Sequence, residues 1–403
     1  MEREELAAWL RLVLTPGVGS DTARRLLAAF GLPQAIFDAS SAALQQLASP
    51  AQVKALHRTP ESLPSLLETT WQWLGQHDPQ VEHRLVTLAD ATYPASLLEI
   101  EDPPLMLYLL GRTSLLDTPF AAEAGMAQPS SHWPSQALAM VGSRNPTPQG
   151  QQNAQQFAKA FSASGLCVVS GMALGIDGAA HLGALSAVDE AAPAKRLCTI
   201  AVIGTGIDRV YPRQHRELAH RIARHGLIVS EYPLGTPPLA SNFPKRNRLI
   251  AGLSQGTLVV EAALASGSLI TARLAAEQGK EVFAIPGSIH NPQSRGCHAL
   301  IRQGAKLVET AQDVQEELRW PSSPITDANP ARKTHTQSGP HATSDSSNDT
   351  LLHALGTDPV GLDALLARTG LDTATLQARL LELELNGQVG RLPGGLFQRL
   401  WQG

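Results

Sequence analysis

Runs of consecutive apolar residues alternate with segments of helical spacing through the middle of this chain. Seven such runs follow one another from Ala137 onward, at 137–143, 166–171, 199–206, 227–233, 257–262, 281–287 and 305–310. Continuous apolar runs, unlike alternating ones, indicate strands that are buried on both faces. The pattern therefore predicts an α/β fold with an extended, doubly wound, Rossmann-like parallel sheet, in which ligands bind beyond the carboxyl ends of the strands.

The first 85 residues (1–85) show helical apolar spacing with short breaks and contain no strand-like run. Residues 12–31, LVLTPGVGSDTARRLLAAFG, predict two helices joined by a tight turn, as in a helix-hairpin-helix or SAM-like domain. Such a turn can offer backbone N–H groups to a DNA phosphate, but it also occurs where two helices simply pack together. We favour the packing role. Residues 86–136 are extended and marked by proline, which predicts a lead-in to the sheet, and residues 113–136 resemble a surface insertion.

The core domain, 86–320, is followed by a segment of different composition. Half of residues 321–350 are Pro, Ser or Thr, and only one is a large aliphatic residue, which predicts a flexible linker. Residues 351–403 predict three helices and a short β-hairpin, as in a winged helix. The third helix, at about 372–386, carries Arg379 as its only cation, so we expect protein contact or autoregulation rather than duplex DNA binding.

The overall composition limits these interpretations. The chain has 403 residues, 43% of them hydrophobic, and a formal net charge of −4, so any nucleic-acid site must be a local basic patch. Cys167, Cys198 and Cys297 are isolated in the sequence, which predicts buried thiols rather than disulfides or a metal site. No apolar run is long enough to cross a membrane, and the first residues predict an amphipathic helix rather than a signal peptide. We therefore expect a cytoplasmic protein.

The segment SNFPKRNRLIAGLS, residues 241–254, is the most informative stretch for function. Ser241 and Asn242 are capping residues, which predict the start of a helix here. Three cations crowd the positive end of that helix, at Lys245, Arg246 and Arg248. Each exposed cation opposes the helix dipole by roughly 0.3–1 kcal/mol, so we expect an external anion, a chain of phosphates. Phe243 adds a stacking face, and Asn242 and Asn247 add hydrogen-bonding groups.

Four glycine-rich segments follow predicted strands of the core domain: VGSRNP at 141–146, SGMALGID at 170–177, VIGTGIDRVYP at 202–212 and ASGSLITA at 265–272. Glycine permits close backbone approach to an anion, and nearby hydroxyl and N–H groups can bind it. The candidate phosphate-loop residues are Gly142, Gly204, Gly206, Ser266, Gly267 and Ser268. Arg209 stands where a dinucleotide loop has its third glycine, so the chain lacks a plain NAD fingerprint, and we expect no cofactor.

Arg144 directly follows a predicted buried strand and so belongs to the rim of the sheet. Its guanidinium can fork to phosphate oxygens or stack on a base, and the alternative is a structural ion pair with Asp177 or Glu261. Asp177 and His181 stand four residues apart on a predicted helix and could form an acid–base pair, although a helix cap and a packed histidine are commoner. No catalytic motif is complete, so we expect a binding protein without catalytic or metal-ligating residues.

With these motifs in place, the chain resembles the DNA-processing protein A family, DprA, also called Smf. The resemblance rests on an ordered set of motifs, VGSRNP, SGMALGIDGAAH, AVIGTGIDRVYP, SEYPLG, SNFPKRNRLIAGLS, VVEAALASGSLITA and AIPG. It implies a SAM-like N-terminal domain, an extended Rossmann core that binds single-stranded DNA, and a homodimer. It also implies a role in natural transformation, in which incoming single strands are protected and the RecA recombinase is loaded onto them.

The resemblance also places the family's DNA-contacting positions on this sequence. They fall on Ser143, Arg144, Ser170, Gly171, Lys245, Arg246, Asn247 and Arg248. We therefore predict a non-catalytic recombination mediator. Its expected partners are single-stranded DNA, RecA and a second copy of itself, and we expect no binding to a membrane. Two rivals stay open: a Rossmann-like enzyme that binds or hydrolyses nucleotides, and a regulatory scaffold whose winged helix binds duplex promoters or a partner protein.

Overall fold

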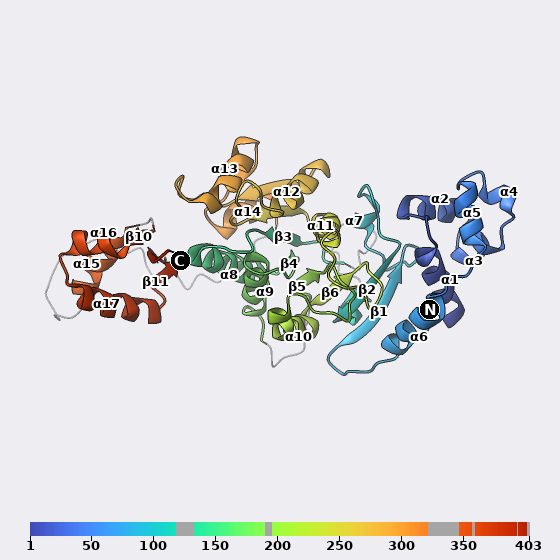
Figure 1. Ribbon diagram of the computed structural model, residues 1–403, viewed down its shortest axis with the longest axis horizontal. Coiled ribbons are helices and arrows are strands. Elements are labelled where there is room, and N and C mark those ends of the chain that lie inside the picture. Colours follow the sequence, from blue (N-terminus) through green and yellow to red (C-terminus); the bar gives the residue numbers. More distant parts are fainter. Residues whose placement is uncertain (118–132, 190–195, 321–345, 357–358, 393, 401–403) are drawn as a thin grey trace.

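The structure is a computed structural model that describes residues 1–117, 133–189, 196–320, 346–356, 359–392 and 394–400. A helical unit, a central α/β domain and a small C-terminal domain lie in a row along the long axis of the molecule (Figure 1). Among the described residues, none of the helices combines the length and the apolar character that crossing a bilayer requires.

A nine-stranded sheet forms the centre of the molecule, in the order β1-β2-β6-β5-β4-β3-β7-β8-β9. The strands are β1 Glu82–Thr87, β2 Met106–Gly111, β3 Ala137–Val141, β4 Cys167–Ser170, β5 Thr199–Val202, β6 Leu227–Ser230, β7 Gly256–Val259, β8 Glu281–Ala284 and β9 Lys306–Leu307. All seven strands predicted from Ala137 onward are present, and they pair in parallel. The predicted lead-in contributes β2, which is antiparallel to β1 and β6, and the last two residues of β1. The first four residues of β1 lie in 1–85, so the expectation that this segment contains no strand is wrong at its end.

Helices cover both faces of this sheet, as the continuous apolar runs predicted. One face carries α7 Ala95–Leu98, α11 Asn242–Gly252, α12 Ser268–Glu277 and α13 Arg295–Arg302. The other carries α8 Pro148–Ala163, α9 Ile176–Leu185, α10 Arg216–His225 and α14 Ala311–Glu317. Figure 1 shows α11, α12 and α13 on one side of the strands and α8, α9 and α10 on the other. The three cysteines are buried within this core and form no disulfide, as expected.

The order of the strands creates a crevice at one edge of the sheet. β3 lies between β4 and β7, so the chain builds the sheet in one direction through β4, β5 and β6 and in the other through β7, β8 and β9. The loops that follow β3 and β7 therefore diverge to opposite faces. Such a switch point is where doubly wound folds bind their ligands.

The N-terminal unit is helical, with α1 Arg3–Leu14, α2 Ser20–Phe30, α3 Pro33–Asp38, α4 Ser41–Leu44, α5 Pro50–Leu56 and α6 Leu63–Leu74. The predicted helix–turn–helix at 12–31 is confirmed, although its assignment as a SAM-like domain stays a prediction. Trp73 of α6 joins this unit to the sheet, since its ring makes edge contacts with His83 and Tyr108 at centroid distances of 4.9 and 5.9 Å.

The C-terminal domain has the predicted winged-helix order. Its elements are α15 Ser346–Leu355, β10 Val360–Gly361, α16 Leu362–Thr369, α17 Thr373–Leu385, β11 Val389–Leu392 and β12 Leu396–Arg399, with the strands in the order β10-β12-β11. The linker prediction extended too far, because residues 346–350 form the first half of α15. The rest of the predicted linker, 321–345, lies outside the described residues.

The predicted surface insertion, 113–136, is packed at both ends. Thr113–Leu116 form a 3-10 turn in which Thr113 and Leu116 are buried. Trp133 is 5% exposed, and its indole Nε1 donates to the Thr92 carbonyl at 2.8 Å. Because these ends bury side chains against the core, the prediction is wrong for them. Its central part, 118–132, lies outside the described residues.

Candidate nucleic-acid interface

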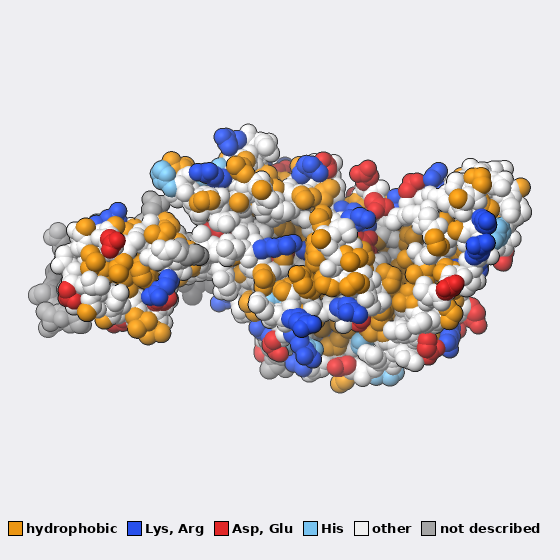
Figure 2. Space-filling model, viewed as in Figure 1, with side chains coloured by type: hydrophobic (Ala, Val, Ile, Leu, Met, Phe, Trp, Pro, Cys, Tyr) orange, Lys and Arg blue, Asp and Glu red, His pale blue; other side chains and the backbone are white. Residues whose placement is uncertain are grey.

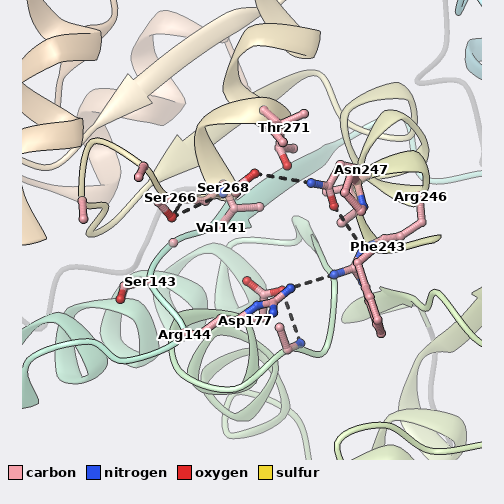
Figure 3. A pocket seen from close by; sticks show the side chains of 18 of the residues that line it. Val141, Ser143, Arg144, Asp177, Phe243, Arg246, Asn247, Ser266, Ser268 and Thr271 are labelled. Atoms are coloured by element: carbon pink, nitrogen blue, oxygen red, sulfur yellow. Dashed lines mark hydrogen bonds and ion pairs between the residues drawn. The ribbon is translucent and has the colours of Figure 1, made fainter. Parts of the chain in front are cut away.

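A groove of about 690 Å³ lies beyond the carboxyl ends of β3, β4 and β7, at the switch point of the sheet. Figure 3 shows side chains converging on it from the β3 loop, from α9, from the start of α11 and from the start of α12. Among the predicted site residues, the groove brings together Gly142, Ser143, Arg144, Phe243, Arg246, Asn247, Ser266, Gly267 and Ser268.

Two helices begin at this groove, and the N-cap residue of neither makes a side-chain hydrogen bond. Ser241 occupies the N-cap of α11 and Gly267 that of α12. The predicted side-chain cap is therefore wrong, because Asn242 instead donates from Nδ2 to the Gly204 carbonyl at 3.1 Å. The first N–H groups of α12 are used inside the protein, since Ser268 donates to the Ser266 hydroxyl at 3.4 Å and Leu269 to the Ser266 carbonyl at 3.1 Å. The positive ends of the two helix dipoles still favour an anion in the groove.

Arg144 is the exposed cation of the groove. Its guanidinium carbon lies 5.8 Å from the centre of the Phe243 ring, and among the described residues it forms no ion pair. The alternative, an ion pair with Asp177 or Glu261, is not observed. Glu261 instead accepts hydrogen bonds from the backbone N–H of Thr147 at 2.8 Å and from its hydroxyl at 2.6 Å. Arg144 is therefore available to an external phosphate.

The loop that carries Arg144 is held by backbone hydrogen bonds. The N–H of Ser143 donates to the Glu261 carbonyl at 2.7 Å, and the Ser143 carbonyl accepts from Ile176 at 3.1 Å. Gly175 follows with φ +80°, and a Cβ there would lie 2.3 Å from the Ser143 carbonyl. Glycine is therefore required at this crossing. The loop presents Arg144 from a fixed backbone, which lowers the cost of ordering it on binding.

Arg246 lines the groove from beneath, with its guanidinium held by the protein. The residue is 4% exposed, and its Nη1 donates to the Gly171 carbonyl at 2.5 Å and to the Val202 carbonyl. Its Nη2 lies 4.0 Å from an Asp177 carboxylate oxygen. Burial lowers the pKa of Arg246, and the nearby Asp177 opposes that shift. Arg246 was expected to bind phosphate with a free guanidinium. In the structure this guanidinium is instead hydrogen-bonded to carbonyls at the ends of β4 and β5.

The other two cations of the basic segment do not line the groove. Arg248 is held between Glu231, at 2.5 Å, and Asp102, at 3.4 Å, so its charge is already neutralised. Lys245 is exposed but does not line the groove. Successive helical residues are rotated by about 100°, so positions 245, 246 and 248 cannot all face one ligand.

Five further predicted residues lie under the surface or outside the groove: Ser170, Gly171, Asn242, Gly204 and Gly206. Ser170 is fully buried, and its hydroxyl donates to the Met140 carbonyl at 2.6 Å. Gly171 offers its carbonyl to Arg246. A Cβ at Gly204 would lie 3.0 Å from the Phe243 ring, so this glycine makes room for the aromatic side chain. These residues shape the groove without a side chain that a ligand could contact.

Two residues that line the groove were not among the predicted site residues. Thr271 is 1% exposed and lines the groove from α12, and Tyr211 lines it from the loop after β5. Both lie in glycine-rich segments, and nothing in the sequence distinguishes these two side chains from their neighbours. Among its described lining residues, the groove contains no histidine, cysteine, lysine or glutamate. No cluster of three potential metal ligands occurs within the described part of the chain.

Asp177 and His181 do not form an acid–base pair. Asp177 lines the groove, and its carboxylate accepts from the Ala173 N–H at 3.3 Å. Burial raises the pKa of Asp177, and Arg246 opposes that rise. The His181 Nδ1 lies 2.7 Å from the Thr199 hydroxyl, inside the core. Of the predicted alternative, the packed histidine is confirmed. The predicted cap is not, because the N-cap of α9 is Gly175 and no side chain caps this helix.

We expect His181 to make the free energy of unfolding depend on pH. Burial, and then the nearby His215 and Arg246, lower the pKa of His181 from 6.5 to about 3. Below pH 6.5 the unfolded chain therefore binds a proton that the native state excludes, so native stability falls as the pH falls. His181→Asn keeps a polar group for Thr199 but does not titrate. The stability advantage of the wild type over this variant should shrink by about 2 kcal/mol between pH 7 and pH 5.

Urea denaturation at both pH values measures this change. Gln46→Ala serves as the control, because Gln46 is exposed and carries no titratable group, so its difference from the wild type should not vary with pH. An advantage of the wild type over His181→Asn that stays constant from pH 7 to pH 5 would contradict the argument.

Comparisons with known proteins agree with this architecture. The family described as DNA recombination-mediator protein A matches residues 84–319, and the DprA winged helix domain matches residues 335–395. Protein Smf of Escherichia coli is 38% identical over 336 residues, which cover 82% of this chain and 80% of that protein. Protein Smf of Synechocystis is 32% identical over 424 residues, which cover 99% of this chain and 100% of that protein.

A solved structure shows the same relationship. The X-ray structure of DNA processing protein A (DprA) from Streptococcus pneumoniae superposes with a TM-score of 0.61 at 32% identity, over 79% of this chain and 98% of the other. The family match covers the nine-stranded sheet and the groove, and the second match falls on the winged-helix domain. The chain therefore belongs to the DprA/Smf family.

Proposed function

We propose that this protein binds single-stranded DNA in the groove as a recombination mediator and performs no catalysis of its own. The observation that carries the proposal is the convergence of Arg144 with the N-terminal ends of α11 and α12. Three sources of positive potential meet there in a chain whose net charge is −4. Relatives in Streptococcus pneumoniae and Bacillus subtilis are named DNA processing protein DprA, which supports a DNA ligand.

The size and lining of the groove favour a single strand over a duplex. A volume of about 690 Å³ is that of a small-molecule site, so it admits nucleotides of an open strand but not an intact double helix. Phe243 is half-buried at the same place and offers a ring face, which an unpaired base can use and a paired base cannot. Phosphates would bind at Arg144 and the helix starts, and bases would lie against the ring.

Titration of the full chain with a labelled single strand and with a duplex of the same sequence tests this proposal. We expect preference for the single strand, with affinity that falls as salt rises because phosphate binding releases counterions. A variant that lacks residues 346–403 should retain single-strand binding, since the groove lies in the α/β domain. Loss of binding in that variant, with duplex binding in the full chain, would favour the regulatory scaffold.

A nucleotide-hydrolysing enzyme is the second candidate. The groove would accommodate a mononucleotide, and Asp177, Ser266 and Thr271 are polar groups within it. Incubation with nucleoside mono- and triphosphates, followed by measurement of released base and phosphate, separates the two functions. We expect no turnover, and any turnover that Arg144→Ala abolishes would establish the enzyme instead.

The family resemblance extends the proposal to partners and setting. We propose that the protein acts as a homodimer in the cytoplasm, protects incoming strands in natural transformation and helps to load RecA onto them. The groove supports the strand-binding part of this role. RecA filament formation on strands coated with single-strand-binding protein, with and without this chain, tests the loading part.

A further inference from the structure

Three large apolar side chains are exposed at the groove or next in sequence to residues that line it. Tyr211 is 49% exposed, Leu239 is 48% exposed and Leu174 is 39% exposed. They come from three different loops, those that follow β5, β6 and β4. Tyr211 itself lines the groove, Leu239 lies between the lining residues Pro238 and Ala240, and Leu174 follows the lining residue Ala173. We call Tyr211, Leu239 and Leu174 the apolar rim.

Tyr211 extends the aromatic surface that begins at Phe243. The two ring centroids are 5.5 Å apart and the ring planes are inclined by 39°. The guanidinium carbon of Arg144 lies 5.8 Å from the centre of the Phe243 ring. Phe243 is therefore near both a cation and a second, more exposed ring. Folding does not account for this exposure, because an apolar side chain at the surface contributes little burial.

The chemistry of this row suits a strand with unpaired bases. A nucleotide chain carries its charges on the phosphates and its flat apolar faces on the bases, at regular spacing along one polymer. The groove offers the same two features. Its anion site lies at Arg144 and the helix starts, and the exposed ring of Tyr211 lies next to the Phe243 ring. Figure 2 shows apolar side chains gathered over α11 with Lys and Arg side chains around them.

We propose that Tyr211 stacks on a base of the bound strand, next to the nucleotide whose phosphate lies at Arg144, and that the apolar rim holds the bases that follow. This inference rests on the proposed single-strand binding and adds a second recognition element to it. Arg144 supplies affinity that depends on salt, whereas Tyr211 supplies affinity that depends on the presence of a base.

Binding of a normal oligonucleotide and of an abasic oligonucleotide of the same length separates the two contributions. Tyr211→Leu keeps an apolar side chain of moderate size but removes the ring. We expect it to weaken binding of the normal strand by about fivefold or more, the range of one lost base stack, with the salt dependence unchanged. Its affinity for the abasic strand should equal that of the wild type, because the phosphate contacts are intact.

Two control variants accompany this experiment. Tyr211→Phe keeps the ring and should bind both strands as the wild type does. Leu385→Ala removes a side chain that is 81% exposed on the winged-helix domain, and it should also leave both affinities unchanged. Thermal unfolding checks that Tyr211→Leu is folded, because its unfolding midpoint should equal that of the wild type.

The outcomes distinguish this inference from the proposed function. A wild-type protein that fails to bind the normal strand would overturn both. If the wild type binds normally, two results overturn the stacking role alone. In one, Tyr211→Leu loses affinity equally for the normal and the abasic strand; in the other, it binds both strands as the wild type does. Loss of self-association in Tyr211→Leu, measured by sedimentation, with both affinities retained would assign the apolar rim to a protein contact instead.

Discussion

Replacement of Arg144 by alanine is expected to weaken single-strand binding about tenfold to a hundredfold. Arg144 is the exposed cation of the groove, and it has no ion-pair partner among the described residues, so its guanidinium is available to a phosphate. Hydrogen bonds to charged groups contribute about 1.5–3 kcal/mol. The slope of log affinity against log salt should also decrease by about 0.7, the value for one phosphate contact on a single strand.

Fluorescence anisotropy at several salt concentrations measures both quantities. Arg144→Lys should bind with intermediate affinity, because lysine keeps the charge but cannot form the planar fork of guanidinium to phosphate. Arg58→Ala is the matched control, since Arg58 is exposed on the N-terminal helical unit, away from the groove. Equal affinity and equal salt slope in Arg144→Ala and the wild type would rule out the proposed anion site.

Replacement of Arg246 by methionine is expected to lower the free energy of unfolding by about 3–5 kcal/mol, the usual cost of leaving a buried charged partner unpaired. The guanidinium is buried and donates to the carbonyls of Gly171 and Val202. Methionine would leave both carbonyls without this donor. It would also leave the buried Asp177 carboxylate without its nearest cation.

Denaturant unfolding of Arg246→Met and Lys245→Met makes the comparison within one segment. Lys245 is exposed, so its substitution should change the free energy of unfolding by no more than about 0.5 kcal/mol. The opposite pattern, in which Arg246→Met unfolds like the wild type but loses strand binding, would show that Arg246 contacts phosphate directly.

The main features of the fold follow from local sequence patterns. Burial on both faces requires continuous apolar strands, and the seven runs from Ala137 onward all became parallel strands of one sheet. The same holds for the winged-helix domain, where Asp372 caps the third helix and Asn386 ends it as predicted. The boundaries were less predictable at 346–350, because serine and asparagine suit both a linker and a helix start.

The candidate site was located by sequence, but its working residues were only partly identified. The glycine-rich segments after β3 and β7 do meet at the switch point, as strand order in a doubly wound sheet requires. Tyr211 of a loop and Thr271 of α12 were not predicted, because only the packing of the neighbouring elements decides which side chains face the groove. Ser170 was assigned to the ligand although its hydroxyl is used inside the core.

The basic segment 241–254 shows most clearly what each level of information decides. The sequence by itself determined that a helix begins there, that it carries three cations, and that it follows a strand of a parallel sheet. Only the tertiary structure decided what each cation does. Arg246 meets strand-end carbonyls, Arg248 meets Glu231 and Asp102, and Lys245 meets solvent. The reason is physical, since a charge next to an anion or a carbonyl that distant parts of the chain supply is already satisfied.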